Sequence, residues 1–376
     1  MRVLRVATVP FFVLHHLRAQ IEDTLAAGHE VIVAASDGEG AEELRRMPGI
    51  RFVGVDIPRE ISFFRDLRAL FALLRVVRET RPDILHSTTP KAGLLGALAG
   101  WLAGVPVRLH TFTGQAWATR SGPVRWIARF CDWVVVKLNT RCYADSESQR
   151  RFMVEQGVCR EGEVGVLGTG SLAGVDLRRF NRELLFPRKA SLRERYGVPE
   201  GARVLCFVGR IARDKGVFEL IEAFRRVKAE IPSAVLLMVG PEESAEPIPR
   251  DPAIRVVGYD PNPENFLAIS ELLCLPSYRE GFGNVVIEAG ALGVPAVGTK
   301  IPGLVDAIVD GVTGTLVPAR DADALAKAIL RLLRDDALRK RMGEAARARA
   351  EAQFDSKRVN GLVLEEYRRL LPQSRP

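Results

Sequence analysis

The chain has 376 residues, of which 47% are hydrophobic and 27% charged, and its formal net charge is +8. This composition excludes a disordered or fibrous protein, and the length favours two globular domains, since a domain commonly has about 100–200 residues. The five cysteines are an odd number without a CxxC pair, which argues against a disulfide scaffold. We therefore expect reduced thiols and a cytoplasmic location.

Two apolar stretches superficially suggest a targeting or membrane segment. Residues 1–14 combine early arginines with an apolar run, yet Arg18 and Gln20 follow where a signal peptide would need small residues. Residues 92–107 form an apolar run of 16 residues with four glycines, and a membrane-spanning helix needs about 20. We predict a first β-strand in the former and a buried helix in the latter.

Short β-like runs alternate with helical stretches in the first half of the chain. The predicted strands cover residues 3–9, 31–36, 51–57, 83–88, 105–114, 142–146 and 163–170. Apolar residues fall at helical spacing between several of these runs, most clearly over residues 66–80 and 92–103. This alternation predicts a parallel sheet with helices on both faces.

The second half of the chain restarts the same scheme. Its predicted strands cover residues 203–210, 234–240, 254–259, 272–277, 294–299 and 313–318. The polar segment 178–200 contains two prolines and is interpreted as the linker. We predict an α/β protein with two doubly wound, Rossmann-like domains that face each other across a cleft, where ligands bind beyond the carboxyl ends of the strands.

The most informative stretch is residues 277–295, where a Gly-Phe-Gly turn separates a strand end from a helix that begins near Asn284. The first N–H groups of such a helix have no intrahelical partners, and the helix dipole makes the position suitable for phosphate. Glu280 lies before the turn and Glu288 about one helical turn inside, where carboxylates can accept hydrogen bonds from sugar and ribose hydroxyls. Alone, the two glutamates would be better explained as a solvated loop acid and a favourable helix charge.

A second strand end carries two cations. Residues 203–210 end in Gly209-Arg210, and Lys215-Gly216 precede the next predicted helix. Two cations after a glycine turn suit a diphosphate, because Arg grips oxygens bidentately and Lys supplies a compact charge. The spacing does not match the phosphate loop GxxxxGK[ST].

Together, these segments resemble the nucleotide-sugar half of GT-B glycosyltransferases, and specifically glycosyltransferase family 4 with its Glu-x7-Glu motif from Glu280 to Glu288. Residues 170–180 and 293–318 are similar to further segments of that family, so the likeness covers almost all of residues 160–320. Residues 86–114 are similar to members that build bacterial surface polysaccharides on lipid carriers.

The resemblance implies two groups of site residues. The catalytic group comprises Glu280, His110, Arg210 and Lys215. The substrate-binding group comprises Glu288, Gly209, Gly283, Asn284, Val285 and Tyr259. In this family pattern the two cations hold the diphosphate, Glu288 accepts from the ribose, Glu280 binds a hydroxyl of the transferred sugar, and His110 lies near the reacting sugar carbon.

The resemblance also implies a reaction and a domain organisation. Residues 1–180 would form the acceptor-binding domain, residues 181–355 the nucleotide-sugar domain, and residues 356–376 a helix that crosses back to the first domain. We expect a hexose or N-acetylhexosamine to pass from a nucleotide-sugar, UDP-linked, to a lipid-linked saccharide with retention of configuration. No metal and no cofactor beyond the nucleotide-sugar co-substrate is expected, since all five histidines precede residue 111 and no ligand spacing is present.

One loop departs from the family pattern. Many relatives have a glycine pair after the first strand, where this chain has Pro10-Phe11-Phe12. A direct backbone contact from this loop to the donor phosphates is therefore in doubt, and a hydrophobic wall facing a lipid acceptor is the alternative.

Basic residues concentrate in the segment 61–130, which has ten Lys or Arg residues and three acids. Aromatic residues are interleaved with them or directly follow them: Phe63, Phe64, Phe71, Trp117, Trp126, Phe130 and Trp133. This mixture suits an anionic inner-membrane surface on its cytoplasmic face, and equally a solvated helix face with an apolar side in the core. No nucleic-acid-binding motif is present.

Three other functions compete with sugar transfer. Residues 168–174 imitate a glycine-rich dinucleotide fingerprint, but a polar segment follows where a dehydrogenase would continue with a helix and a strand. A GT-B-fold sugar-nucleotide epimerase is the nearer rival, and it differs from a transferase in that it consumes no acceptor. A non-catalytic, membrane-associated nucleotide-binding relative is the third.

Overall fold

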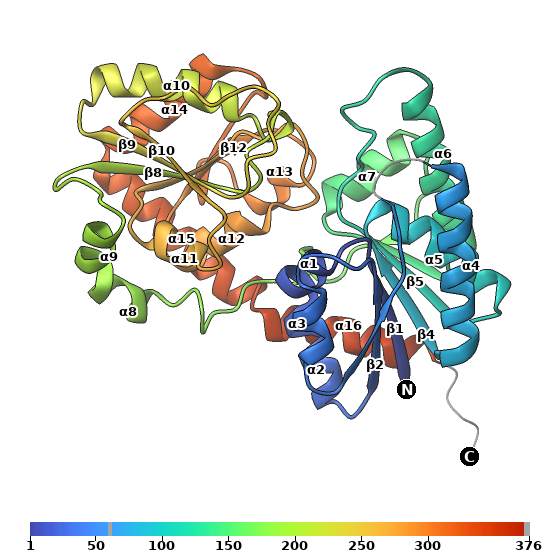
Figure 1. Cartoon of the computed structure of the whole chain (residues 1–376). Helices are drawn as coiled ribbons and strands as arrows, with labels where there is room; N and C mark the ends of the chain where they lie inside the picture. Colours follow the sequence, from blue (N-terminus) through green and yellow to red (C-terminus); the bar gives the residue numbers. More distant parts are fainter. Residues whose placement is uncertain (59–61, 372–376) are drawn as a thin grey trace. The chain divides into compact units, whose positions relative to one another are not determined.

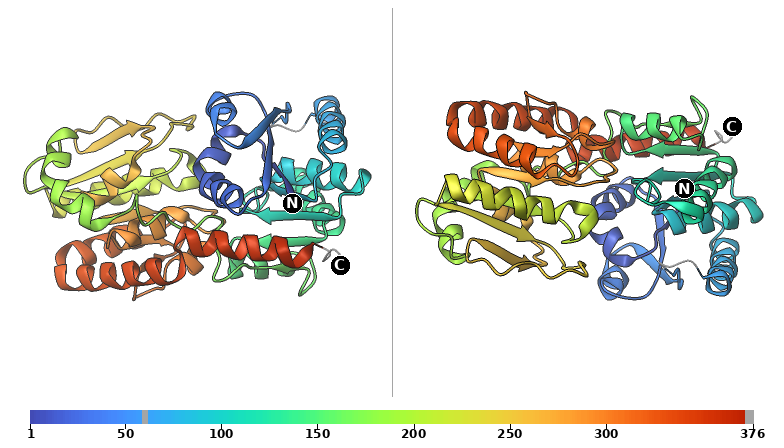
Figure 2. Two further views of the ribbon diagram at one scale, coloured as in Figure 1. Left: turned by 90° about the horizontal axis from the view of Figure 1, so that it is seen from below. Right: turned by 90° about the horizontal axis from the view of Figure 1, so that it is seen from above.

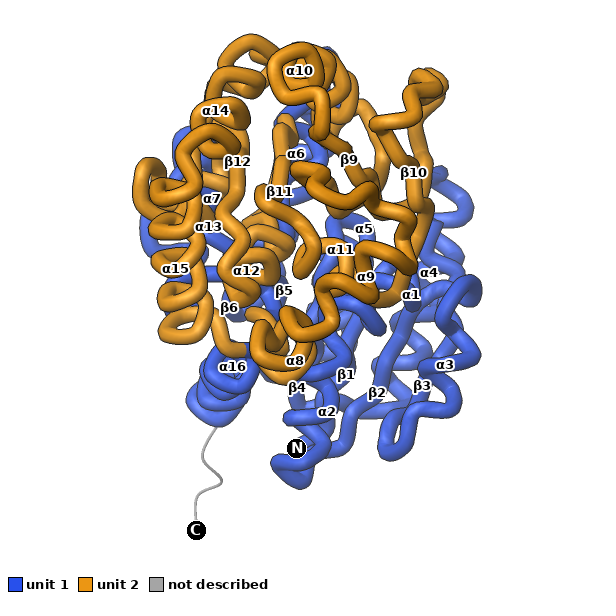
Figure 3. The backbone as a smooth tube through the Cα atoms, turned by 90° about the vertical axis from the view of Figure 1, so that its left-hand side faces the viewer, with its two compact units in different colours: residues 1–173, 356–376 blue, residues 174–355 orange. Residues whose placement is uncertain are grey.

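A computed structural model describes residues 1–58 and 62–371 and divides the chain into two compact units (Figures 1 and 3). Unit 1 contains residues 1–173 and 356–376, and unit 2 contains residues 174–355. Residue 61 of the basic segment and residues 372–376 of the expected C-terminal helix lie outside the described residues.

Unit 1 is built on a seven-stranded parallel sheet of order β3-β2-β1-β4-β5-β6-β7. The strands are β1 (Arg2–Val6), β2 (Glu30–Ala35), β3 (Ile50–Gly54), β4 (Ile84–Thr88), β5 (Val107–Phe112), β6 (Arg141–Ala144) and β7 (Val164–Gly165). The helices are α1 (Pro10–Phe12), the π-helical η1 (Val13–Leu17), α2 (Arg18–Ala26), α3 (Ala41–Arg46), α4 (Phe63–Thr80), α5 (Pro90–Leu102), α6 (Gly122–Leu138), α7 (Glu147–Glu155) and α16 (Ser356–Leu370).

Helices cover both faces of this sheet (Figure 2). Leu4 and Leu85 pack against α4 and α5 on one face, while Val31 and Val33 pack against α2 and α3 on the other. α16 completes the second face with Tyr367, which lies in a core cluster with β1 and β5. Strands buried on both sides read as continuous apolar runs, which is why the sequence pattern identified them.

Unit 2 repeats the architecture with six parallel strands in the order β10-β9-β8-β11-β12-β13. The strands are β8 (Arg203–Val208), β9 (Ala234–Val239), β10 (Ile254–Gly258), β11 (Leu272–Leu275), β12 (Ala296–Thr299) and β13 (Gly314–Val317). The helices are α8 (Arg182–Leu185), the 3₁₀ turn η2 (Phe186–Arg188), α9 (Lys189–Arg195), the 3₁₀ turn η3 (Arg213–Lys215), α10 (Val217–Glu230), α11 (Pro263–Ala268), α12 (Asn284–Ala291), α13 (Leu304–Ala307), α14 (Ala322–Arg334) and α15 (Asp336–Gln353).

Both sheets have the doubly wound order, in which the direction of winding reverses between two neighbouring strands. In unit 2 the reversal lies between β8 and β11, and in unit 1 between β1 and β4. In open α/β sheets ligands bind beyond the carboxyl ends of the strands at such a switch point. The loops that follow β8 and β11 are therefore the positions from which unit 2 would hold a ligand.

Two local expectations were wrong. The segment 178–200 is not an extended linker, because α8, η2 and α9 occupy most of it and Leu185 and Leu192 enter the core of unit 2. Pro10-Phe11-Phe12 is not a loop either: it forms α1, whose first residue is Pro10, a position where proline's missing N–H costs no hydrogen bond.

The first unit ends earlier than residue 180, where the sequence analysis puts the boundary. Residues 174–180 belong to unit 2. The N–H of Val175 donates to the carbonyl of Phe354 at 2.7 Å, and Phe180 is buried in the unit 2 core. These contacts bind the segment to the helices that end unit 2.

Candidate active site

The loop after β8 presents a guanidinium at the carboxyl edge of unit 2. Gly209 ends the strand region with φ +150°, and a Cβ on the neighbouring Gly240 would lie 2.0 Å from the Gly209 carbonyl oxygen. The backbone of the loop that follows β9, which begins at Gly240, therefore contacts the backbone of the loop that follows β8. Arg210 follows, and its guanidinium donates to Oε2 of Glu243 at 2.8 Å and to Oδ2 of Asp214 at 3.2 Å.

Lys215 and Glu280 form an ion pair across the switch point. The Nζ of Lys215 lies 2.6 Å from Oε1 of Glu280, and the Ser277 hydroxyl donates to the same oxygen at 2.7 Å. The two side chains are 17% and 12% exposed, so the pair is poorly solvated. The structure thus brings together a cation from the β8 loop and a carboxylate from the β11 loop, two residues that the sequence analysis assigned to the site.

The N-terminus of α12 lies directly after this carboxylate. Gly283 is its N-cap with φ +87°, a conformation that glycine adopts without strain, and Asn284 and Val285 form the first turn. A Cβ on Gly303 would lie 2.6 Å from the carbonyl oxygen of Gly281, so the loop before α13 packs against the Gly-Phe-Gly turn. The turn is held by close backbone packing.

Glu288 lies one turn into α12 and is partly buried. Burial raises the pKa of its carboxyl to about 7, Arg179 opposes this shift, and Glu264 adds to it. Arg179 itself donates to Oε2 of Glu264 at 2.7 and 2.9 Å, so the Glu264 carboxylate largely offsets the positive charge of the Arg179 guanidinium. A carboxyl that is half protonated near neutral pH is an uncommon group, and such groups gather at functional sites.

The sequence analysis missed a third cation at this edge. Arg279 precedes Glu280, and its Nη2 donates to Oδ2 of Asp214 at 3.2 Å, the same oxygen that accepts from Arg210. Asp214 therefore bridges two guanidinium groups. The position of Arg279 beside Glu280 was visible in the sequence, but only the fold shows that the two arginines share a carboxylate.

The two remaining predicted residues are not on the β8 or β11 loops. Tyr259 follows β10, so it lies at the same carboxyl edge of the unit 2 sheet but two strands from β8, and it is 45% exposed. His110 belongs to β5 of unit 1 and is 1% exposed. Among the predicted residues, those on the loops after β8 and β11 and at the start of α12 gather at one edge.

Unit 1 has exposed aromatic side chains on α4 and α6. Phe63, Phe64, Trp126 and Phe130 are between 61% and 77% exposed. Trp117 is not part of this surface, because it is 1% exposed and its indole N–H donates to Oδ2 of Asp132 at 2.6 Å. We define the aromatic surface as Phe63, Phe64, Trp126 and Phe130 together with the cations of the same two helices.

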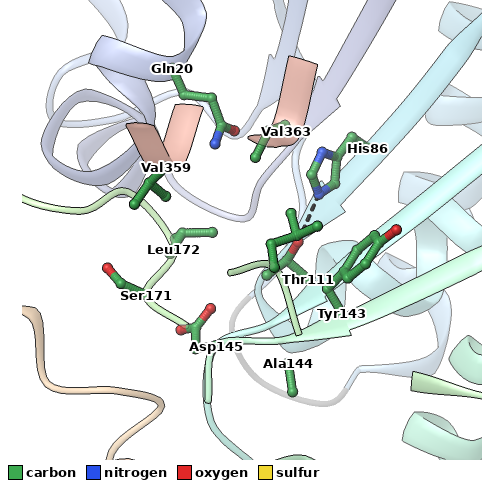
Figure 4. A pocket seen from close by; sticks show the side chains of 11 residues that line it. Gln20, His86, Thr111, Tyr143, Ala144, Asp145, Ser171, Leu172, Val359 and Val363 are labelled. Atoms are coloured by element: carbon green, nitrogen blue, oxygen red, sulfur yellow. Dashed lines mark hydrogen bonds between the residues drawn. The ribbon is translucent and has the colours of Figure 1, made fainter. Parts of the chain in front are cut away.

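A small pocket lies in unit 1 between the sheet and α16 (Figure 4). Gln20, His86, Asp145 and Val359 are among its lining residues, and no residue of the predicted site lines it. The amide atoms of Gln20 have no hydrogen-bond partner. Polar atoms buried in this way commonly hold ordered water.

No helix in residues 1–58 and 62–371 combines the length and the apolar character that crossing a bilayer requires. In the same part of the chain, no group of three or more His, Cys, Asp or Glu side chains is arranged to hold a metal ion.

Known families and proteins match both units. Residues 13–170 match the family described as glycosyl transferase 4-like domain, and residues 188–349 match glycosyl transferases group 1. The capsular polysaccharide biosynthesis glycosyltransferase CapM of Staphylococcus aureus is 30% identical over 367 residues, which cover 95% of this chain and 94% of CapM. The chain therefore belongs to the glycosyltransferases of this type, which combine a glycosyltransferase 4-like domain with a group 1 domain.

Two further proteins extend the comparison. The UDP-Gal:alpha-D-GlcNAc-diphosphoundecaprenol alpha-1,3-galactosyltransferase of Escherichia coli is 25% identical over 292 residues, 74% of each chain. The structure of Alr3699/HepE from Anabaena in complex with UDP and glucose has a TM-score of 0.77 at 18% identity, covering 98% of this chain and 100% of that one. The structural likeness shows the shared GT-B fold.

Proposed function

We propose that this glycosyltransferase moves a hexose or N-acetylhexosamine from a UDP-sugar to a lipid-linked saccharide in cell-surface polysaccharide synthesis. The observation that carries the proposal is the Lys215–Glu280 pair beside Arg210 at the switch point of the unit 2 sheet. The names of the relatives support the substrate classes, since one acts in capsule synthesis and another transfers galactose from UDP-Gal to a diphosphoundecaprenol-linked GlcNAc.

The proposed reaction retains the anomeric configuration and needs no metal ion. The bond between the anomeric carbon and the diphosphate oxygen breaks, and the acceptor oxygen bonds to the same face of that carbon. The acceptor's proton passes to the leaving phosphate oxygen. Arg210 and Lys215 stabilise the charge that develops on the diphosphate, and Glu280 orients the sugar through a hydroxyl.

Nucleotide binding tests the donor assignment through Glu288. A carboxylate accepts hydrogen bonds from two ribose hydroxyls better than a protonated acid does, so binding should select the ionised form. Because the pKa of Glu288 is raised to about 7, UDP affinity is expected to rise as the pH rises through that value. Between about pH 6 and 8 the ionised fraction, and with it the affinity, should increase about tenfold.

The measurement is calorimetric titration with UDP, GDP, ADP, CMP and NADP across this pH range. Glu288→Gln should bind UDP more weakly and lose the pH dependence that the carboxyl causes. Any pH dependence that remains in this variant comes from titration of the nucleotide phosphate. Preference for GDP or ADP would overturn the UDP assignment. Turnover assays then separate transfer from its rivals, because an epimerase consumes no acceptor and a non-catalytic relative does not turn over.

We also propose that unit 1 binds the anionic cytoplasmic face of the inner membrane through the aromatic surface. Helices that follow parallel strands begin at the carboxyl edge of the sheet, so α4 and α6 both start at the edge where ligands bind. α5 packs between them (Figure 1). Phe63 and Phe64 lie in the first turn of α4, and Trp126 lies in the first half of α6. A membrane docked there would present a lipid-linked acceptor to the correct edge.

Charge at this surface is positive. Arg65 and Arg68 of α4 are exposed, and Arg65 lies 3.4 Å from the exposed carboxylate of Asp56. Asp66 is paired with Lys91 at 2.6 Å, and Arg129 stacks over the Trp126 ring at 4.3 Å. Each cation near an anionic bilayer contributes about 1 kcal/mol. Aromatic side chains add apolar contact at the depth of the lipid headgroups.

Co-sedimentation with vesicles tests this surface. Binding is expected to vesicles with about 30% phosphatidylglycerol and to fall with added salt. The double variant Arg65→Gln, Arg68→Gln should weaken binding about 25-fold, at about fivefold per cation. The double variant Trp126→Ser, Phe130→Ser should weaken binding at every salt concentration. Matched controls in unit 2, Arg331→Gln with Arg334→Gln and Val309→Ser with Val312→Ser, should bind like the wild type. Equal binding to neutral phosphatidylcholine vesicles would contradict the electrostatic part.

A further inference from the structure

Two buried histidines lie on neighbouring strands of unit 1. His86 in β4 is 2% exposed and His110 in β5 is 1% exposed. In the sheet register Ser87, the residue after His86, lies opposite His110. Side chains alternate between the two faces of a strand, so Ser87 and His110 share one face and His86 points to the other.

The ring of His110 is fixed from three sides. Nδ1 lies 2.9 Å from the Ser87 hydroxyl oxygen, and Phe112 meets the ring edge-on at 4.4 Å. A Cβ on Gly93 of α5 would lie 2.4 Å from Cε1, so the absence of a side chain there is what makes room for the ring. His110 is therefore held in one orientation.

Two contacts of the Ser87 hydroxyl bear on which nitrogen of His110 carries the proton. Its oxygen also lies 3.2 Å from the carbonyl oxygen of Leu109, which can only accept a hydrogen bond. When the hydroxyl donates to that carbonyl, its lone pair is left to accept from Nδ1–H of His110. Burial lowers the pKa of His110 to about 3, so the ring is neutral and Nε2 has a lone pair.

His86 has the opposite arrangement and serves as an internal comparison. The guanidinium of Arg5, which can only donate, lies 2.7 Å from Nδ1, so Nδ1 is the accepting nitrogen. Nε2 lies 2.8 Å from the Thr111 hydroxyl and carries the proton (Figure 4). Both ring nitrogens of His86 therefore have hydrogen-bond partners within unit 1.

Nε2 of His110 differs from both nitrogens of His86. Within the described residues, no hydrogen bond reaches it. Nor is this nitrogen among the fully buried polar atoms that have no hydrogen-bond partner. The lone pair is therefore available to a ligand.

We propose that Ser87 is a positioning residue that holds His110 as the Nδ1–H tautomer, so that Nε2 accepts a hydrogen bond from a hydroxyl of the bound saccharide. His110 is in this role a fixed acceptor, not a base that titrates during turnover. The identity of the ligand rests on the proposed function, but the tautomer does not.

NMR of the protein labelled with ¹⁵N-histidine tests the tautomer directly. Two-bond ¹H–¹⁵N correlations should show Nδ1–H for His110 and Nε2–H for His86, with His110 neutral down to about pH 5, since its pKa is lowered to about 3. His110→Gln and His86→Gln assign the two patterns. An Nε2–H pattern for His110, or titration near the ordinary histidine value, would overturn the proposal.

Variants of Ser87 connect the tautomer to function. Ser87→Ala should change the His110 pattern, leave that of His86 unchanged, and lower kcat/KM about tenfold, the cost of one misplaced hydrogen bond. Ser87→Thr retains the hydroxyl and should restore both the spectrum and the rate. Gly93→Ala should displace the His110 ring and disturb only its resonances.

The two proposals fail in different ways. If the spectra are as expected but no nucleotide-sugar is turned over, the proposed function fails and the tautomer stands. If the wild type transfers sugar and Ser87→Ala does so at an unchanged kcat/KM, the positioning role of Ser87 fails.

Discussion

Replacing Lys215 by alanine is expected to lower kcat for sugar transfer about 100- to 1,000-fold, the usual cost of removing one donor that stabilises transition-state charge. Lys215 and its partner Glu280 are 17% and 12% exposed, and a charge that is poorly solvated acts strongly on a neighbouring diphosphate. Arg210→Ala should have an effect of the same kind, because its guanidinium follows β8 at the same edge.

Steady-state kinetics distinguishes this role from simple substrate binding. An interaction made mainly in the transition state lowers kcat and kcat/KM together, whereas one made equally in the ground state raises KM alone. Lys340→Ala, which removes an exposed lysine of α15, is the matched control and should leave both constants unchanged. A raised KM with an unchanged kcat in Lys215→Ala would refute the assigned role.

Gly216→Ala is expected to lower the free energy of unfolding by about 3–5 kcal/mol, a large effect for one methyl group. Gly216 has φ +69°, and a Cβ there would lie 2.0 Å from the carbonyl oxygen of Pro276. Both colliding groups belong to the backbone, so neither can move aside as the end of a flexible side chain could. The substitution should therefore separate the loops after β8 and β11, and with them Lys215 and Glu280.

Gly201→Ala is a nearly ideal control for this variant. Gly201 has the same φ of +69°, but a Cβ there would meet nothing within 4 Å. It should cost about 1 kcal/mol, the conformational strain alone. Urea unfolding measured by circular dichroism gives the difference between the two variants, and equal midpoints for both would show that the backbone collision does not occur.

Most strands of both units were predictable because they are buried on both faces, whereas the edge strands β3 and β10 are partly exposed. Each predicted apolar run overlaps an observed strand, although the run 163–170 is reduced to the two residues of β7. The segment 178–200 was misjudged for the opposite reason. The segment is mostly polar and contains only single apolar residues such as Leu185 and Leu192. Their burial depends on contacts with residues that are distant in the sequence.

The candidate site was predictable as a set of motifs but not as a network of contacts. The motifs on the β8 and β11 loops, together with the family resemblance, selected Lys215 and Glu280, and parallel strands bring their carboxyl ends to one edge. The bridge from Asp214 to both Arg210 and Arg279 depends on side-chain directions that no spacing encodes. Which nitrogen of His110 carries its proton likewise depends on a hydroxyl in another strand.

The return of α16 to unit 1 affects how the protein is made. Unit 2 is continuous over residues 174–355, whereas the core of unit 1 needs Val363 and Tyr367 from α16. The hydroxyl of Tyr367 also accepts from the buried guanidinium of Arg5 at 2.6 Å. During synthesis on the ribosome, the unit that begins first therefore lacks part of its interior until α16 emerges. Unit 1 therefore stays incomplete throughout the synthesis of unit 2.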